Sequence, residues 1–338
     1  MDKTDHCGIE VSSEQLLVAL RRDGQALPLK PFSNTPAGHR AVAAYLARKG
    51  RVVRVCMEST GVYGLDLALL LHRQAGLEVM VANPRAARHF AQALMQRSKT
   101  DALDAAMLLE FAARMEFQPW RPPSRAVLHL CALARRLAAI TELCVAEKNR
   151  LHAARAAQAL PAVIRQDLDR SIAFHQRAAA RLTRQARKLI EADPLLRERF
   201  EQLDSVPGIA ETSAIPLLAE LGMLSPDLVV RQWVASAGLD PREYSSGRSV
   251  HKKVRISKTG NRHLRRALYM PALVAVQHDP HLRAFYEHLL ARGKMKMQAL
   301  VAVMRKLLHA IFGMFKHHQL YVGARLFHRP AQTSAQAA

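Results

Sequence analysis

The pattern of apolar and polar positions divides the first 118 residues into short strands and amphipathic helices. Alternating or continuous apolar runs predict strands at residues 6–12, 15–22, 26–32, 52–59 and 78–84. Apolar positions three and four residues apart predict helices at about residues 37–49 and 64–74, and helical segments over residues 84–114. Three strands joined by short turns, followed by alternating helices and strands, predict an α/β domain with the element order of a ribonuclease-H-like fold.

Beyond this domain the pattern becomes helical. Paired prolines in the segment 120–124 interrupt regular structure and predict a linker. Apolar residues then recur at alternating spacings of three and four, which predicts the seam of a coiled coil or of a long helical hairpin. The seam consists of Leu130, Leu133, Leu137, Ile140, Cys144 and Leu151, interrupted by Glu147. A second amphipathic helix is expected after Pro161, to about residue 192.

Further helices are expected at about residues 261–277, 280–292 and 296–315. Before them, the segment SVPGIAETSAIPLLAEL resembles half of a helix-hairpin-helix, in which backbone amides at the glycine turn contact a phosphate. The expected fold class is therefore α/β plus α, with a helical arm between two functional parts. We place the boundaries at residues 1–118, 119–200, 201–328 and 329–338, the last segment being a disordered tail.

The charge of the chain indicates a polyanionic partner. Fifty Lys and Arg residues against 28 Asp and Glu residues give a net charge of +22, and nucleic acid best explains such an excess. The excess lies mainly after residue 118, where 35 basic residues face 16 acidic ones. No apolar stretch approaches the roughly 20 residues of a membrane span, and the first residues lack the order of a signal peptide. We therefore expect a cytoplasmic protein without a membrane partner.

Four acidic residues occur where a nuclease-type metal site would need them. Glu10 lies in the first predicted strand, and Glu58 ends a later one. Asp101 and Asp104 are three residues apart, so a helix places both on one face. Carboxylates from separate elements can hold one or two Mg²⁺ ions, which prefer oxygen ligands. Structural roles are the alternative, since any strand-rich domain with 12 acids has some at strand ends, and Asp101 and Asp104 can stabilise a helix start. The joint order of the four acids favours the metal site.

A dense basic segment contains the second candidate site. Between Arg242 and Arg266 there are nine Lys or Arg residues and one acid, Glu243. Such a run is costly unless a polyanion neutralises it. Within the run, Ser245 and Ser246 precede a glycine, in backbone that a substrate can approach closely. A serine there can attack a phosphodiester, although the residues alone favour the simpler interpretation that both serines are polar turn residues.

Five segments together resemble the "one-ten" family of insertion-sequence transposases, which are relatives of the Piv/MooV DNA invertases. The segments are GIEVS, MESTGVYG, KTDALDA, SVPGIAE and GLDPREYSSGRSVHKKVRISKTGNRHLRRAL, and the resemblance covers about residues 6–316. It implies a RuvC-like DEDD domain, a coiled-coil arm and a C-terminal transposase domain with a catalytic serine. It also implies a homodimer or homotetramer that cuts and rejoins donor and target DNA, guided by a noncoding bridge RNA.

Carried over by position, the resemblance implies the roles of individual residues. The implied ligands of Mg²⁺, with Mn²⁺ as an alternative, are Glu10, Glu58, Asp101 and Asp104. Ser246 is the implied nucleophile, and Ser245 is the less favoured one. The residues expected to contact nucleic acid are Arg242, Arg248, Lys252, Lys253, Arg255, Lys258, Arg262, Arg265 and Arg266.

The chain departs from the family pattern at two positions. Glu10 replaces the first Asp of the DEDD set, which moves the carboxylate by about one carbon–carbon bond. Ala210 replaces the last glycine of Pro-Gly-Ile-Gly. Two other functions stay open at this point. One is a RuvC-like structure-specific nuclease that uses water in place of serine, and the other is a nucleic-acid-binding protein whose metal site has decayed.

Overall fold

The computed structural model describes residues 4–58, 61–96, 98–156, 161–247 and 250–327, with the backbone alone for residues 251–253. The chain divides into two compact units, Met1–Pro122 and Pro123–Ala338. The first unit combines strands and helices, and the second is mostly helical, so the expected α/β plus α class is confirmed at this level.

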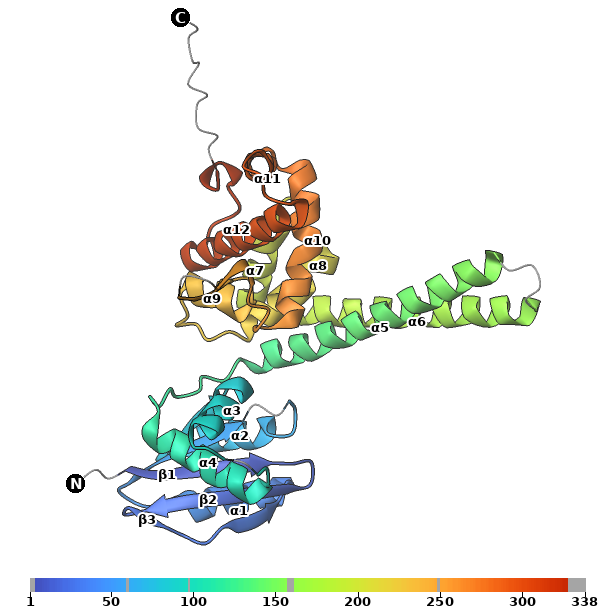
Figure 1. The fold of residues 1–338 in the computed structure, drawn as a ribbon. Coiled ribbons are helices and arrows are strands. Elements are labelled where there is room, and N and C mark those ends of the chain that lie inside the picture. Colours follow the sequence, from blue (N-terminus) through green and yellow to red (C-terminus); the bar gives the residue numbers. More distant parts are fainter. Residues whose placement is uncertain (1–3, 59–60, 97, 157–160, 248–249, 328–338) are drawn as a thin grey trace, which may run out of the picture. The chain divides into compact units, whose positions relative to one another are not determined.

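The first unit contains a mixed sheet with helices on both faces (Figure 1). Its strands are β1 (Thr4–Val11), β2 (Gln15–Arg22), β3 (Gln25–Ala26), β4 (Lys30–Ser33), β5 (Val52–Glu58) and β6 (Leu77–Ala82). The order is β3-β2-β1-β5-β6, and β4 also pairs with β2. β1 is antiparallel to β2 but parallel to β5, which is in turn parallel to β6. The parallel pair β1 and β5 is central, so both faces of these strands require a cover.

Four helices supply that cover. They are α1 (Pro36–Leu46), α2 (Leu65–His72), α3 (Pro84–Ala93) and α4 (Asp101–Arg114). One core cluster joins Ile9 and Val55 of the sheet to α1 and α2, and another joins Cys56 to α3 and α4. Because successive side chains of a strand point to opposite faces, Gly8 and Glu10 of β1, like Cys56 and Glu58 of β5, face α3 and α4.

The strand predicted at residues 26–32 is interrupted in the structure. It forms β3 and β4, separated by residues 27–29. The pairs Arg21↔Ala26 and Val18↔Lys30 leave one extra residue on this outer strand, as in a β-bulge. Pro28 lies in the gap and has no N–H to donate, which explains why pairing breaks there.

Gly8 allows α4 to lie directly on β1. A Cβ atom at this position would lie 2.2 Å from the carbonyl oxygen of Ala105 and 2.2 Å from the backbone nitrogen of Leu109. Both atoms belong to the α4 backbone, so they cannot rotate away as a flexible side chain would. The absence of a side chain at Gly8 therefore sets the distance between β1 and the first turns of α4.

We expect Gly8→Ala to lower the free energy of unfolding of the first unit by at least about 2 kcal/mol, because the added methyl forces α4 away from the sheet. Chemical denaturation, with hydrogen exchange followed by mass spectrometry, would show the loss and locate it in α4. Gly313→Ala is the control, since a Cβ atom there meets nothing within 4 Å. Unchanged exchange in α4 of the Gly8 variant would contradict the close contact.

The second unit consists of helices and one hairpin. Its elements are α5 (Arg125–Ala156), α6 (Ala162–Ala192), α7 (Pro194–Asp204), α8 (Glu211–Gly222), α9 (Val230–Ser236), β7 (Pro241–Ser246), β8 (Val250–Ile256), α10 (Arg262–His278), α11 (Pro280–Ala291), α12 (Lys296–His317) and the 3-10 turn η1 (Gly323–Arg325). The three helices expected near the C-terminus correspond to α10, α11 and α12. The tail predicted to be disordered, residues 329–338, lies outside the described residues.

Helices α5 and α6 pack against each other as a long pair that projects from the other helices of the unit (Figure 1). Near the far end, Cys144 and Leu151 of α5 are buried with Leu168 and Ile172 of α6. At the near end, Leu130 and other residues of both helices join the main core of the unit. The predicted seam is therefore used within the chain, and whether it also pairs with a second chain stays a prediction.

Helix α12 runs through that main core. It is long and apolar enough to cross a membrane by length and composition, and half of its most apolar window is buried inside the unit. A core helix of a soluble protein passes the same test.

Between α7 and α8, Gly208 adopts a φ of +93° and lies against α10, where a Cβ atom would be 2.8 Å from the Pro271 carbonyl oxygen. Gly208 thus serves close packing, and a phosphate contact at this turn stays a prediction.

Candidate functional site

Glu10 and Glu58 lie side by side at the carboxyl ends of two adjacent central strands, β1 and β5. β1 and β5 are parallel neighbours with Ile9 opposite Met57, so the next residue of each strand is one of the two glutamates. Both side chains are half-buried and both face α4. Parallel strands therefore bring together two carboxylates that are 48 positions apart in the sequence.

Helix α4 supplies the other two acids. Thr100 caps the helix, because its side-chain oxygen accepts a hydrogen bond from the Leu103 amide. Asp101 and Asp104 lie in the first turn, where the helix dipole favours negative charge. Asp101 is exposed and Asp104 is half-buried. The contact of α4 with Gly8 directs this end of the helix toward the two glutamates.

The four carboxylates repel one another. Burial, followed by the charges of Asp104, Glu58 and Asp101, raises the pKa of Glu10 to about 7. Burial also raises the pKa of Glu58, and the charge of Asp104 adds to this rise. Lys99 opposes both shifts. The Oε2 atom of Glu10 is buried without a hydrogen-bond partner. The residues thus form one cluster of negative charge that Lys99 offsets only in part.

A divalent cation fits this cluster by chemistry. The donors are carboxylate oxygens, which hard cations prefer, and a cation would relieve the repulsion and engage the unpaired oxygen of Glu10. Within the described part of the chain, however, no three His, Cys, Asp or Glu side chains are placed closely enough to hold one ion directly. Binding would therefore require the side chains to draw together, which their partial exposure permits.

Two neighbours of the cluster were not among the predicted site residues. Lys99 precedes the cap of α4, and its positive charge lowers the pKa of both Glu10 and Glu58. Gln96 donates a hydrogen bond from Nε2 to Oδ1 of Asp104 at 3.5 Å. Both lie just before the KTDALDA segment or within it, so a wider reading of that segment would have included them.

Ser246 lies at the end of a hairpin that the sequence pattern did not predict. β7 and β8 pair antiparallel, with Ser246 opposite Val250 and Ser245 opposite His251. All six residues of β7 are exposed. Gly247, which follows Ser246, has a φ of +56° and open space around its Cα. The local backbone is therefore accessible, as was inferred for a serine that must meet a bulky substrate.

The hairpin holds positive charges opposite each other. Arg242 pairs with Arg255 across the two strands, and both are exposed. Like charges directly opposite one another destabilise a sheet unless an anion lies between or above them. Of the other predicted contact residues, Arg248 lies outside the described residues, and so do the side chains of Lys252 and Lys253.

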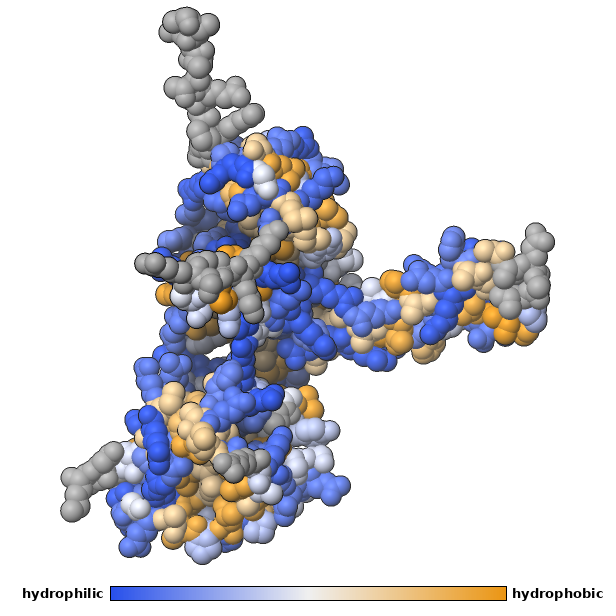
Figure 2. All heavy atoms as spheres, in the orientation of Figure 1, coloured by the Kyte–Doolittle hydropathy of each residue, from blue (hydrophilic) through white to orange (hydrophobic). Residues whose placement is uncertain are grey.

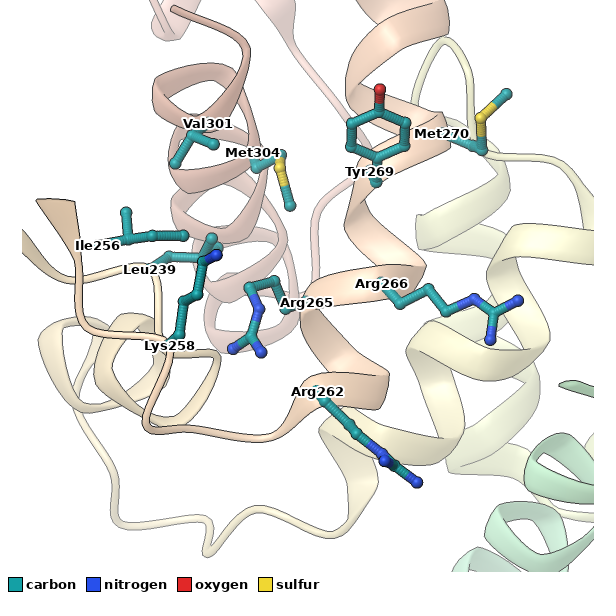
Figure 3. A pocket seen from close by; sticks show the side chains of 10 residues that line it. All are labelled: Leu239, Ile256, Lys258, Arg262, Arg265, Arg266, Tyr269, Met270, Val301 and Met304. Carbon is teal, nitrogen blue, oxygen red and sulfur yellow. The ribbon is translucent and has the colours of Figure 1, made fainter. Parts of the chain in front are cut away.

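The remaining four predicted contact residues gather around a pocket of about 430 Å³ at the base of the hairpin (Figure 3). They are Lys258, Arg262, Arg265 and Arg266. Apolar side chains complete the wall, among them Met304 of α12 and Tyr269 of α10. Arg265 donates to the Ala237 carbonyl oxygen at 2.9 Å, and Arg266 pairs with Glu142 of α5. Arg265 thus also fixes the local backbone, and Arg266 links α10 to the arm.

A buried carboxylate positions the start of α10. Glu220 of α8 is 1% exposed and accepts hydrogen bonds from Arg135 at 2.9 and 3.1 Å. It also accepts one from Nδ2 of Asn261 at 2.6 Å. Asn261 in turn caps α10 through its Oδ1 atom. Burial raises the pKa of Glu220, but the bonds from Arg135 and Asn261 lower it more, so it lies below the usual range of a glutamate.

Because its pKa is lowered by folding, Glu220 should stabilise the second unit above about pH 4.5 and lose this contribution as the pH falls through the lower folded value. Glu220→Gln is expected to cost about 2 kcal/mol at pH 7 and to flatten the decline toward acid. Denaturation at several pH values would measure both. Glu191→Gln, at an exposed pair with Arg187, should cost under about 0.5 kcal/mol. Equal losses would exclude a special role for Glu220.

Comparison with known proteins assigns the chain to a family. A transposase model of the IS110 type, named for a DEDD set, matches residues 7–155, and a model of the transposase IS116/IS110/IS902 family matches residues 200–287. The Pilin gene-inverting protein of Moraxella bovis is 29% identical over 270 residues, which are 79% of this chain and 81% of that protein. An insertion element IS110 protein of Streptomyces coelicolor is 33% identical over 149 residues, 44% of this chain and 35% of that protein.

The two matched regions contain both candidate sites, since Glu10 to Asp104 lie in the first and Ser246 lies in the second. Set against the DEDD name, the four acids of this chain read Glu, Glu, Asp, Asp. The resemblance stated from the motifs is thereby confirmed. The chain is a transposase and belongs to the IS116/IS110/IS902 family.

Proposed function

We propose that this transposase is a DNA recombinase in which Ser246 attacks the DNA backbone while Glu10, Glu58, Asp101 and Asp104 bind Mg²⁺ or Mn²⁺. The observation that carries the proposal is the position of Ser246 at the exposed turn end of a hairpin whose strands hold Arg242 opposite Arg255, neither of which has an ion pair among the described residues. Cations beside a nucleophilic hydroxyl both hold the phosphate and stabilise the charge that develops on it. The related Moraxella proteins are named for inverting a pilin gene, and inversion requires cutting and rejoining.

The proposed chemistry conserves phosphodiester bonds. The Ser246 Oγ atom attacks phosphorus and loses its proton, forming a phosphoserine diester. The bond from phosphorus to one DNA oxygen breaks, and that oxygen takes up a proton and leaves as a hydroxyl. Attack of a DNA hydroxyl on the phosphoserine reverses these changes and joins the new strands. Such an exchange needs no external energy source, because each broken bond is replaced by an equivalent one.

The carboxylate cluster would hold the metal. When bound there, the ion would polarise a phosphate and stabilise a leaving oxygen. Glu58 and Asp104 interact most directly with Glu10, so we infer that these three are the principal ligands and that Asp101, being exposed, contributes less. The strand order with a central β1 supports a ribonuclease-H-like, specifically RuvC-like, fold for this unit.

The family resemblance extends the proposal to partners. We infer donor and target DNA as substrates, a noncoding bridge RNA as guide, and a homodimer or homotetramer as the working assembly. We also infer that α5 and α6 act as a coiled-coil arm within that assembly. The net charge of +22 supports nucleic-acid partners, and a cytoplasmic location follows from them.

The test is to trap the covalent intermediate. The intact chain is incubated with Mg²⁺, candidate bridge RNA and end-labelled DNA, then denatured and separated. Label attached to protein supports the serine mechanism. Cleavage without attached label would favour a nuclease that uses water, and binding without cleavage would favour a chain whose metal site has decayed through the change at Glu10.

A further inference from the structure

Helix α6 carries a stripe of positive charge that lies far from both candidate sites in the sequence. From residue 170 to residue 190 there are six Lys or Arg residues and no Asp or Glu. Five of the six are spaced by seven, four, three and four residues, which places them on one face of a helix. These stripe residues are Arg170, Arg177, Arg181, Arg184 and Lys188. All five are exposed.

The stripe is not neutralised within the described part of the chain. Other arginines of the arm pair with acids: Arg150 with Glu147, Arg155 with Asp169, and Arg187 with Glu191. None of the five stripe residues has such an ion pair there. Phe174 lies on the same face between Arg170 and Arg177 and is 60% exposed. The stripe therefore combines unpaired cations with an exposed aromatic ring, a combination found where proteins bind nucleic acid.

The opposite face of α6 identifies the kind of partner. Leu168, Ile172 and Ile190 point away from the stripe and are buried within the second unit. A helix that binds a lipid surface needs its apolar face free to enter the membrane, and this one is already covered. Figure 2 shows hydrophilic residues along the arm, interrupted by scattered apolar ones. The surface offered is thus one for a polyanion in water.

We propose that the α6 stripe binds the phosphate backbone of a nucleic acid, as a second interaction surface beside the Ser246 hairpin. At 1.5 Å per residue the stripe is about 27 Å long, which corresponds to about eight phosphates of one strand at 3.4 Å each. Cations four residues apart are about 6 Å apart along the axis, close to two phosphate steps. The arm thereby supports the nucleic acid at a distance from the cleavage site and carries no sequence information itself.

The test measures the salt dependence of binding by the full chain. Arg177→Gln, Arg181→Gln and Arg184→Gln are combined in one stripe variant. Each lost phosphate contact reduces the slope of log K against log salt by about 0.9, so we expect a reduction of about 2.7 and at least about a tenfold loss of affinity near 0.1 M salt. The probes are a DNA duplex, an RNA duplex and a single strand. Each is about 30 base pairs or nucleotides long, which is about three turns of a duplex.

The matched control removes the same charge from paired cations of the arm, through Arg150→Gln, Arg155→Gln and Arg187→Gln. Its slope should stay within about one contact of the native chain. A second variant, with Arg177→Lys, Arg181→Lys and Arg184→Lys, should keep the native slope if the effect is one of charge. Circular dichroism and thermal unfolding establish that all variants are folded.

The slopes of the stripe variant and its control decide whether the stripe binds nucleic acid. A loss confined to RNA or to DNA supports the stripe and identifies which of them it holds. Equal slopes for the stripe variant and its control, with every probe, overturn the inference. The inference rests on nucleic acid as the partner and not on the serine or the metal. Failure of covalent trapping together with a stripe effect would therefore refute the proposed mechanism alone.

Discussion

Asp104→Asn is expected to reduce metal-dependent DNA cleavage by at least about 100-fold, because the amide loses the charge that holds a divalent cation beside Glu10 and Glu58. Asp101→Asn should reduce it less, since Asp101 is exposed at the first position of α4. The measurement is cleavage of labelled DNA as a function of Mg²⁺ and Mn²⁺ concentration. A weakened ligand set should raise the concentration of metal needed for half-maximal cleavage.

Asp66→Asn is the matched control. Asp66 lies in the first turn of α2, just as the two aspartates lie in the first turn of α4, so the control removes an equivalent interaction with a helix dipole. It lies outside the carboxylate cluster and should leave cleavage within about twofold, with a small change in stability. Undiminished cleavage by both α4 variants would remove the carboxylate site from the mechanism.

The departure at Glu10 is examined in the same assay. Glu10→Asp restores the acid expected from the family pattern and shortens the side chain by one methylene. We expect cleavage at or above the native rate, because the carboxylate stays in a cluster whose negative charge Lys99 offsets only in part. A large loss would mean that the surrounding residues have adjusted to the longer side chain, and Glu10 would then be a native feature of this site.

The fold could be predicted where the apolar pattern is regular. Strand β1 alternates between buried and partly buried positions except at Gly8, which is buried as well, and α10 to α12 repeat apolar residues with the helical period. The mixed α/β and mainly helical parts were therefore recognised from the sequence. The hairpin of β7 and β8 was missed because all residues of β7 are exposed, so no apolar alternation marks it. Its strands are defined by pairing with each other.

The candidate sites follow a similar division. The motifs located Glu10, Glu58, Asp101 and Asp104, and parallel pairing of β1 with β5 explains why acids far apart in sequence meet. The reason for Gly8 could not be seen, because the close approach of α4 is a contact between distant segments. The same holds for Glu220 of α8, because its partners lie in other parts of the chain, Arg135 in α5 and Asn261 at the cap of α10. Local patterns do not contain such contacts.

Ser246→Ala is expected to abolish the covalent protein–DNA adduct and to reduce strand exchange by at least about a thousandfold, since no other group is proposed to attack the phosphate. DNA and RNA binding should stay within about twofold of the native chain, because a hydroxyl contributes little to an interface of many phosphates. The adduct is measured by denaturing electrophoresis of labelled DNA, and binding is measured separately at fixed salt concentration.

Ser245→Ala is the matched control, because it removes the same hydroxyl from the adjacent position of the same strand. Adjacent residues of β7 point to opposite faces of the hairpin, so a single nucleophile should depend on one of them alone. We expect the Ser245 variant to keep the adduct. Loss of the adduct in Ser245→Ala, with retention in Ser246→Ala, would move the nucleophile by one residue and keep the mechanism. If the double variant still cleaves at the native rate, water is the nucleophile, and the carboxylate cluster alone carries the chemistry.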